Sequence, residues 1–392
     1  MRRYSEADEQ RIHLQKLVRN WTRSGLLGRE QGQALEASLQ GDLKRTGLML
    51  RLGLAVFTGI VLVAAVGLSF MLTDLRSETA VAVLLAIFGV MSLLAADWVV
   101  TAFKAYRHGV EEMLAMAGVG LLAFSPVLLT SSLFSSSTES LGFAVAGAVG
   151  CVASLWVYRR FGFLYAPIVA MACAATIPMQ LIASRPMERV GAAVVLLAAF
   201  VVARSVRVDP LNERLSEERA ILQAAALVGV YLVLNVHLTP GGFIAYYSGE
   251  PMPPWFRWGT YACTWLLPAA ALWLGVRDRE RWLIDAGLAM ALATLVTNKS
   301  YLGWPRQPWD PMLLGLFLAA VALGGRRWLA SGPGGERAGF SPMRILESDL
   351  LAIRVAGLAS AVIQPASAVP PAAQPESFGG GRSGGAGAGG SF

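Results

Sequence analysis

The sequence is dominated by apolar runs of helical length, which short polar segments separate. A bilayer core of about 30 Å requires about 20 predominantly apolar residues per helix, because lipid offers no partner to a free backbone group. None of the runs alternates as a β-barrel strand does. We therefore expect an all-α, polytopic transmembrane bundle of about ten spans, at residues 52–72, 79–100, 112–134, 141–158, 163–183, 187–203, 220–238, 256–276, 281–297 and 311–330.

The amino-acid composition agrees with a membrane protein. Of the 392 residues, 55% are hydrophobic and 15% are charged, and the mean hydropathy is +0.52. A typical soluble protein devotes about a quarter of its residues to charge, and a disordered chain combines low hydrophobicity with high net charge. The composition therefore excludes both of these classes.

The basic residues predict the orientation of the chain in the membrane. Cytoplasmic loops of membrane proteins carry an excess of Lys and Arg. With the N-terminus inside and ten spans, 27 of the 33 Lys and Arg residues fall in inner segments and six in outer loops. This asymmetry predicts a multi-pass protein of the bacterial inner (cytoplasmic) membrane with both termini in the cytoplasm.

The net charge of +7 has a simple explanation in this topology. The basic residues are spread over the inner loops as pairs, whereas nucleic-acid binding requires them to gather on one face. We expect contact with the lipid bilayer and its anionic headgroups, and no nucleic-acid partner.

The chain divides into four parts, of which the first is a cytoplasmic helical hairpin at residues 1–46. Its helices are expected at 7–24 and 29–39, with Ala34, Leu35 and Leu39 inward in the second. Helices this short bury little surface alone, so we expect the hairpin to pack on a partner surface. The ten-span domain follows at residues 47–330.

The hairpin carries a pattern seen in other membrane proteins. Trp21, then Gly25-Leu26, then Glu30-Gln31 at the start of the second helix precede the many spans. This segment resembles an uncharacterised family of predicted prokaryotic multi-pass membrane proteins, known only as a domain of unknown function. The resemblance covers about 40 residues and the general layout, and it implies no activity.

The C-terminal part after the last span has two predicted segments. Residues 341–363 form an amphipathic pattern that begins with Ser341-Pro342, and we expect a helix on the cytoplasmic face of the membrane. An eleventh span is the alternative, but it would place several charges in lipid. Residues 364–392 are first Pro/Ala-rich and then Gly-rich, which predicts a disordered tail. The hairpin or the tail is the candidate contact for a protein partner, and an oligomer is an open alternative.

The residue types that most often form catalytic or metal sites do not come together in the predicted topology. The three histidines fall in the hairpin, an inner loop and the outer end of the seventh span. The three cysteines lie inside apolar runs, and no nucleophile elbow, zinc-protease motif or phosphate loop occurs. We therefore expect no catalytic centre, no metal site and no cofactor.

Two carboxylates in the spans are candidates for ion or proton coupling, because ionisable residues in a membrane are costly. Asp97 lies near the inner end of the second span. Asp285 lies at the inner end of the ninth span, four residues after Arg281, a spacing that allows the two to pair along one helix face. The alternative is that both carboxylates only pair or reach the interface.

The outer surface carries many aromatic residues. One interpretation is an aromatic belt at the membrane interface, and the other is a lid over an outward-facing pocket for an apolar, aromatic or glycan ligand. The candidate residues of this pocket or lid are Tyr246, Tyr247, Trp255, Trp258, Trp304, Trp309 and His237.

A stripe of small residues in the fourth span predicts close helix packing. Gly142, Ala146, Gly150 and Ser154 recur every four positions and therefore share one helix face. We expect a helix of the same chain on this face, and a second copy of the chain is the alternative.

These observations support three hypotheses about function. The first is a non-enzymatic membrane scaffold or regulatory component that recruits partners through its soluble ends. The second is a transporter or flippase of a small or lipidic solute, for which Asp97 and Asp285 would have to face one cavity. The third is a membrane enzyme acting on a lipid-linked substrate, which depends on His237, Asn235 and the outer aromatic residues.

Overall fold

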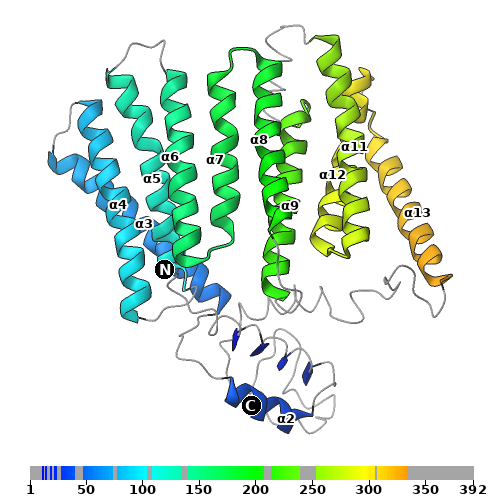
Figure 1. The fold of residues 1–392 in the computed structure, drawn as a ribbon, viewed down its shortest axis with the longest axis horizontal. Coiled ribbons are helices and arrows are strands. Elements are labelled where there is room, and N and C mark those ends of the chain that lie inside the picture. The colour runs from blue at the N-terminus through cyan, green and yellow to red at the C-terminus, as the bar shows by residue number, and fades with distance from the viewer. Residues whose placement is uncertain are drawn as a thin grey trace, which may run out of the picture. The chain divides into compact units, whose positions relative to one another are not determined.

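The computed structural model is helical throughout its described part, where eleven helices and no strands occur (Figure 1). The described residues are 11–12, 14–15, 18–19, 22–23, 28–39, 47–73, 77–103, 108–133, 139–206, 213–238, 253–304 and 307–332. The helices are α2 (Arg29–Ser38), α3 (Leu48–Thr73), α4 (Glu78–Phe103), α5 (Val110–Leu133), α6 (Glu139–Phe161), α7 (Tyr165–Leu181), α8 (Arg185–Ser205), α9 (Glu213–Leu234), α11 (Pro254–Asp278), α12 (Arg281–Leu302) and α13 (Asp310–Ala330).

A helix covers each of the ten predicted apolar runs. Seven of these helices are long and apolar enough to cross a membrane, namely α3, α4, α5, α6, α8, α11 and α13. The other three fall short for different reasons: α7 is apolar but has only 17 residues, whereas α9 and α12 carry more polar side chains. The all-α prediction is confirmed for the described residues, and the seven helices support a multi-pass membrane protein.

The helices pack largely in chain order. Each helix from α4 to α9 contacts the next, α11 contacts α12, and α9 packs against both α11 and α12. Figure 1 shows α4 to α9 side by side.

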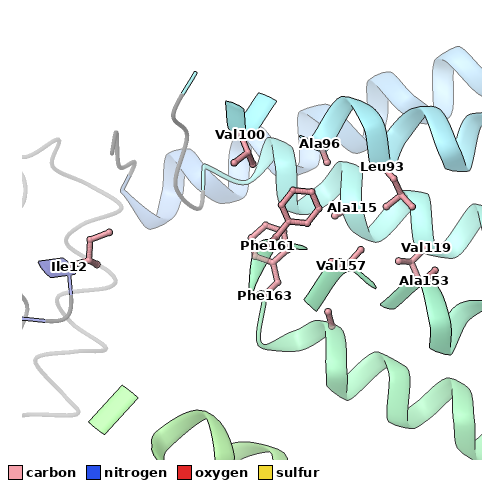
Figure 2. Packing of buried hydrophobic residues seen from close by; sticks show 11 residues of the cluster. Ile12, Leu93, Ala96, Val100, Ala115, Val119, Ala153, Val157, Phe161 and Phe163 are labelled. Carbon is pink, nitrogen blue, oxygen red and sulfur yellow. The ribbon is translucent and has the colours of Figure 1, made fainter. Parts of the chain in front are cut away.

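The first core lies between α4, α5, α6 and the start of α7 (Figure 2). It consists of apolar side chains that include Leu93, Ala96, Val100, Ala115, Val119, Ala153, Val157, Phe161, Phe163 and Ala166. The rings of Phe161 and Phe163 stack with their centroids 5.4 Å apart. Small alanines opposite bulky rings allow the four helices to pack closely.

Glycines allow two helix pairs to approach through their backbones. A Cβ atom on Gly118 of α5 would lie 2.9 Å from the carbonyl oxygen of Gly89 on α4. In the same way, a Cβ atom on Gly275 of α11 would lie 2.8 Å from the backbone nitrogen of Ile284 on α12. Helices in membranes use small residues at such contacts because close backbones gain van der Waals attraction.

The small-residue stripe of α6 packs within the chain, as predicted. A Cβ atom on Gly142 would meet Thr130 and Val127 of α5. A Cβ atom on Gly150 would meet Ala123 of α5 and Cys173 of α7. Both partner helices belong to the same chain, so the prediction of an intramolecular contact is confirmed.

Two outer helices contribute almost no buried surface. Among the described residues, α13 contains no buried residue and α3 contains one, Gly59, whereas the apolar stretch of α6 is 39% buried. Nothing lies within 4 Å of a Cβ atom built on Gly315, Gly324 or Gly325 of α13. These two helices therefore present their apolar side chains outward among the described residues.

The described residues of the hairpin make specific contacts. The Gln15 amide donates to the Leu39 carbonyl at 2.6 Å, and Arg19 pairs with Glu36 at 3.1 Å. Gly32 is the buried residue of α2, and a Cβ atom there would lie 2.3 Å from the Thr22 hydroxyl. Because only glycine allows this approach, α2 packs through its Gly32 face.

The prediction that Ala34 and Leu35 face inward in α2 is wrong. Ala34 and Leu35 are exposed, and only Leu39 is partly buried. Trp21, the helix predicted at 341–363 and the tail at 364–392 lie outside the described residues.

Candidate functional site

The two candidate coupling carboxylates each have a basic partner. Asp97 of α4 forms a two-point ion pair with Arg160 of α6, with distances of 2.8 and 3.1 Å between nitrogens and carboxylate oxygens. The two side chains are 19% and 26% exposed. Asp285 lies 3.5 Å from Arg281 on its own helix, and both side chains are 55% exposed.

The structure does not bring Asp97 and Asp285 together. Asp97 belongs to the α4–α6 group of helices, whereas Asp285 lies on α12, which packs against α9 and α11. The i, i+4 spacing revealed the pairing of Asp285 with Arg281. No local pattern could reveal the pairing of Asp97 with a residue 63 positions away.

Ion pairs join different helices near their ends at several places in the structure. Four such pairs connect α3 to α5, α4 to α6, α8 to α11, and α12 to α13. They are Arg51–Glu112, Asp97–Arg160, Arg204–Asp278 and Lys299–Asp310. Paired groups lose much of the cost of lying near lipid, so these contacts act as clamps between helices.

The candidate residues of the outer pocket are mostly exposed. Trp255, Trp258, Trp304 and Trp309 are each more than half exposed, while Tyr246 and Tyr247 lie outside the described residues. Tryptophans exposed at helix ends are typical of an interfacial belt.

His237 differs from the tryptophans because it packs inward. Its ring meets the Tyr301 ring edge-on, with the centroids 4.5 Å apart. The Tyr301 hydroxyl in turn accepts a hydrogen bond from the Val236 backbone at 3.1 Å. His237 is thus held against the end of α9 by a residue of α12.

A buried polar network joins α9, α11 and α12. The Asn235 amide donates to the Tyr231 hydroxyl at 2.9 Å, and the Tyr231 hydroxyl lies 2.9 Å from the Thr294 hydroxyl. The Thr294 hydroxyl donates to the Thr264 carbonyl of α11 at 2.7 Å. The second amide hydrogen of Asn235 points to the Thr297 hydroxyl at 3.1 Å. Each donor in this chain has an acceptor, so the network is satisfied internally.

Arg189 supports the same end of α9. This side chain of α8 is buried, and its guanidinium donates to the Val233 carbonyl at 3.0 Å. The last carbonyls of a helix have no partner within the helix, and its C-terminus carries partial negative charge. A buried cation at this point stabilises the end of α9 from a neighbouring helix.

Sequence reasoning missed this network, although part of its signal is visible. Tyr231 and Asn235 are four residues apart, and Thr294 and Thr297 are three apart, so each pair lies on one helix face. Which face meets which helix depends on packing. The hydroxyls, the amide and the backbone carbonyl of the network are bonded to one another, so the network positions α9, α11 and α12 relative to each other.

The Tyr231→Phe substitution is expected to destabilise the folded protein by about 1–2 kcal/mol, because the buried Asn235 amide loses an acceptor. The Tyr261→Phe variant removes one half-buried bond to Asn298 and should cost less. Unfolding titrations of both variants in mixed detergent micelles measure the difference. Equal stability of the two variants would contradict the role of the network.

The connection between α11 and α12 contains a pH-sensitive carboxyl. Burial raises the pKa of Glu280, as do the Asp278 and Glu217 carboxylates, while Arg219 at 3.8 Å acts in the opposite direction. A raised pKa means that the folded state binds the proton more tightly than the unfolded state does. Stability therefore falls as pH rises from the ordinary Glu pKa of about 4.3 to the raised value, and is flat above it.

The Glu280→Gln variant is expected to lose this part of the pH dependence. Its unfolding midpoint, measured from mildly acidic to neutral pH, should vary less than that of the native chain. Identical pH profiles would show that Glu280 contributes nothing.

The described residues contain no group of three metal-binding side chains, and the three cysteines are free thiols. A comparison of the chain with known protein families, with curated proteins and with solved structures finds no match. The resemblance carried by Trp21, Gly25-Leu26 and Glu30-Gln31 therefore stays a prediction.

Proposed function

We propose that this chain is a ten-span protein of the bacterial inner membrane, with both ends in the cytoplasm, and that it works as a non-enzymatic scaffold or regulatory component. The three helices that are not among the seven most apolar ones, α7, α9 and α12, are compatible with this topology. At 1.5 Å per residue, α7 is roughly 26 Å long, close to the thickness of a bilayer core. Tyr231 of α9 and the threonines Thr294 and Thr297 of α12 take part in the buried network, which removes the cost of placing these hydroxyls in lipid.

The clamping of the helices by ion pairs is the observation that supports a scaffold best. Each of the four interhelical pairs uses its carboxylate to hold a neighbouring helix. A coupling carboxylate in a transporter instead faces a shared cavity and changes partners. The membrane domain therefore suits a rigid anchor, and the soluble ends are the parts available for partners.

The hairpin offers a contact for such a partner. Leu14 and Leu35 are 43% and 42% exposed, although their hairpin buries Val18 and Gly32. Exposed leucines on both helices of a small module favour an apolar protein contact. We propose that a cytoplasmic protein with an apolar patch binds here, with the Gly-rich tail at 378–392 as a second contact.

Cross-linking in native membranes tests the proposal. Full-length chain is compared with a Leu14→Glu, Leu35→Glu double variant and with Gln33→Glu, a control at an exposed position of α2. A partner that cross-links to the native chain should be lost in the double variant and kept in the control. Unchanged partners after deletion of residues 1–40 and of 378–392 would contradict the scaffold.

Flux through reconstituted vesicles tests the transporter alternative. If the chain is a scaffold, proton flux into vesicles that contain it equals flux into vesicles without protein. Flux that requires the protein and changes in the Asp97→Asn, Asp285→Asn double variant would overturn the proposal in favour of transport.

A further inference from the structure

Glu111 is a fully buried carboxyl at the start of α5. Its residue exposure is 0%, in contrast to the carboxylates of the interhelical ion pairs, which stay partly exposed. It lies one helical turn before Ala115, a residue of the first core (Figure 2), and therefore on the helix face that packs against α4 and α6. A carboxyl at this position requires a physical explanation, because burying a charge is costly.

One oxygen of Glu111 has a structural role. Its Oε1 accepts the backbone N–H of His108 at 2.7 Å, which satisfies a free donor at the start of α5. The other oxygen, Oε2, is buried and has no hydrogen-bond partner among the described residues. The imidazole Nδ1 of His108 is likewise buried and has no such partner there. Helix capping thus explains the position of Oε1 but not the burial of Oε2.

The charged groups around Glu111 do not neutralise it. Arg51 of α3 is bound at two points by Glu112, with one distance of 2.6 Å. Arg160 of α6 is bound by Asp97 of α4. Among the described residues, the other ionisable groups that act on Glu111 are the like-charged Glu112 itself and His108. No guanidinium among the described residues is paired with Glu111.

We propose that Glu111 and His108 form a proton-binding site at the start of α5. In the proposed step, the His108 imidazolium gives its Nδ1 proton to a bridging water molecule, and an O–H bond of that water breaks as an O–H bond forms at Oε2 of Glu111, because the two side-chain atoms do not bond each other directly. The imidazolium becomes neutral imidazole and the carboxylate becomes a neutral acid, and His108 then takes a new proton from a hydronium ion of the solvent. The neutral acid can stay buried, whereas the carboxylate favours hydration of this end of the α4–α6 core.

The site goes beyond the scaffold role, because it would make the packing of α5 depend on proton concentration. If the packing of the first turn of α5 changes with pH, the change should also affect α3. Gly109 lies directly against the Arg51 carbonyl of α3, and a Cβ atom on Gly109 would be 2.1 Å from that oxygen. The site is independent of the hairpin and does not require the proposed partner.

Infrared difference spectroscopy of the full-length protein in lipid nanodiscs tests the site. The native chain should show the carbonyl stretch of a protonated carboxylic acid at neutral pH. The band should disappear in Glu111→Gln, which keeps the acceptor for the His108 backbone, and persist in the matched control Glu112→Gln. Absence of the band from the native chain, or its persistence in Glu111→Gln, would overturn the proposal.

A second measurement separates proton binding from a folding defect. In Glu111→Asp the acid band should shift without disappearing. In His108→Gln the band should persist, and its exchange after transfer to heavy water should slow on the order of 100-fold, since a positioned proton donor is lost. Unchanged exchange in His108→Gln would rule out the imidazole as the relay.

Discussion

Replacing Asp97 by alanine is expected to destabilise the folded protein by about 2 kcal/mol. The cost of breaking a fully buried ion pair is about 3–5 kcal/mol, and that of an exposed pair is about 0–1 kcal/mol. The Asp97–Arg160 pair lies between these limits, because both side chains keep some exposure and two bonds join them. The unfolding midpoint in mixed detergent micelles measures the effect.

Asp285→Ala is the matched control, because it removes the same group from a more exposed pair within one helix. Its effect should stay within about 0.5 kcal/mol. The charge-swapped Asp97→Arg, Arg160→Asp variant should regain part of the stability lost by Asp97→Ala. Equal losses in Asp97→Ala and Asp285→Ala would contradict the clamp between α4 and α6.

Replacing Gly118 by valine is expected to destabilise the bundle by about 1–3 kcal/mol or to prevent its folding. The new Cβ atom would lie 2.9 Å from the Gly89 carbonyl oxygen and 2.8 Å from Leu93, both on α4. Overpacking of this kind forces backbones apart, because a carbonyl cannot turn away as a flexible side chain can.

Gly120→Val provides the control two residues further along the same helix. Gly120 is exposed, and a Cβ atom there has nothing within 4 Å. The intrinsic preference of valine over glycine in a helix is the same at both positions. The difference between the two variants in thermal unfolding therefore isolates the contact of α5 with α4, and equal stability would exclude it.

The helices themselves could be predicted from the sequence because membrane physics leaves few choices. A run of about 20 apolar residues has to satisfy its backbone internally, and each of the ten runs is helical. The packing of Gly142 and Gly150 could also be predicted, since residues four apart share a face. Both predictions depend on one helix alone.

Contacts between distant helices could not be predicted. Arg160 is one of several arginines near helix ends, and only the packing of α5 against both α4 and α6 brings it to Asp97. Glu111 precedes its apolar run, so nothing in the sequence indicates that it is buried. In the hairpin, the spacing of apolar residues predicted that Leu35 would face inward. The contact with the first helical segment is made instead by Gly32, which lies against Thr22 and has no side chain to separate the two backbones.

The location of both chain ends in the cytoplasm is the claim on which the proposed scaffold depends most. The number of spans decides on which side of the membrane the C-terminal end lies, and two positions distinguish ten spans from seven. Ser184 lies between α7 and α8, Ser331 follows α13, and both are exposed. If only the seven most apolar helices crossed, Ser184 would be inside and Ser331 outside.

Cysteine labelling with a membrane-impermeant maleimide measures this directly. Cys151, Cys173 and Cys263 are first replaced, and single cysteines are then placed at Ser184 and Ser331, with Ser77 as a position that is outside in both alternatives. In spheroplasts, ten spans predict that positions 77 and 184 are labelled and that 331 is labelled only after lysis. Labelling of 331 from outside, with 184 protected, would contradict the ten-span scaffold.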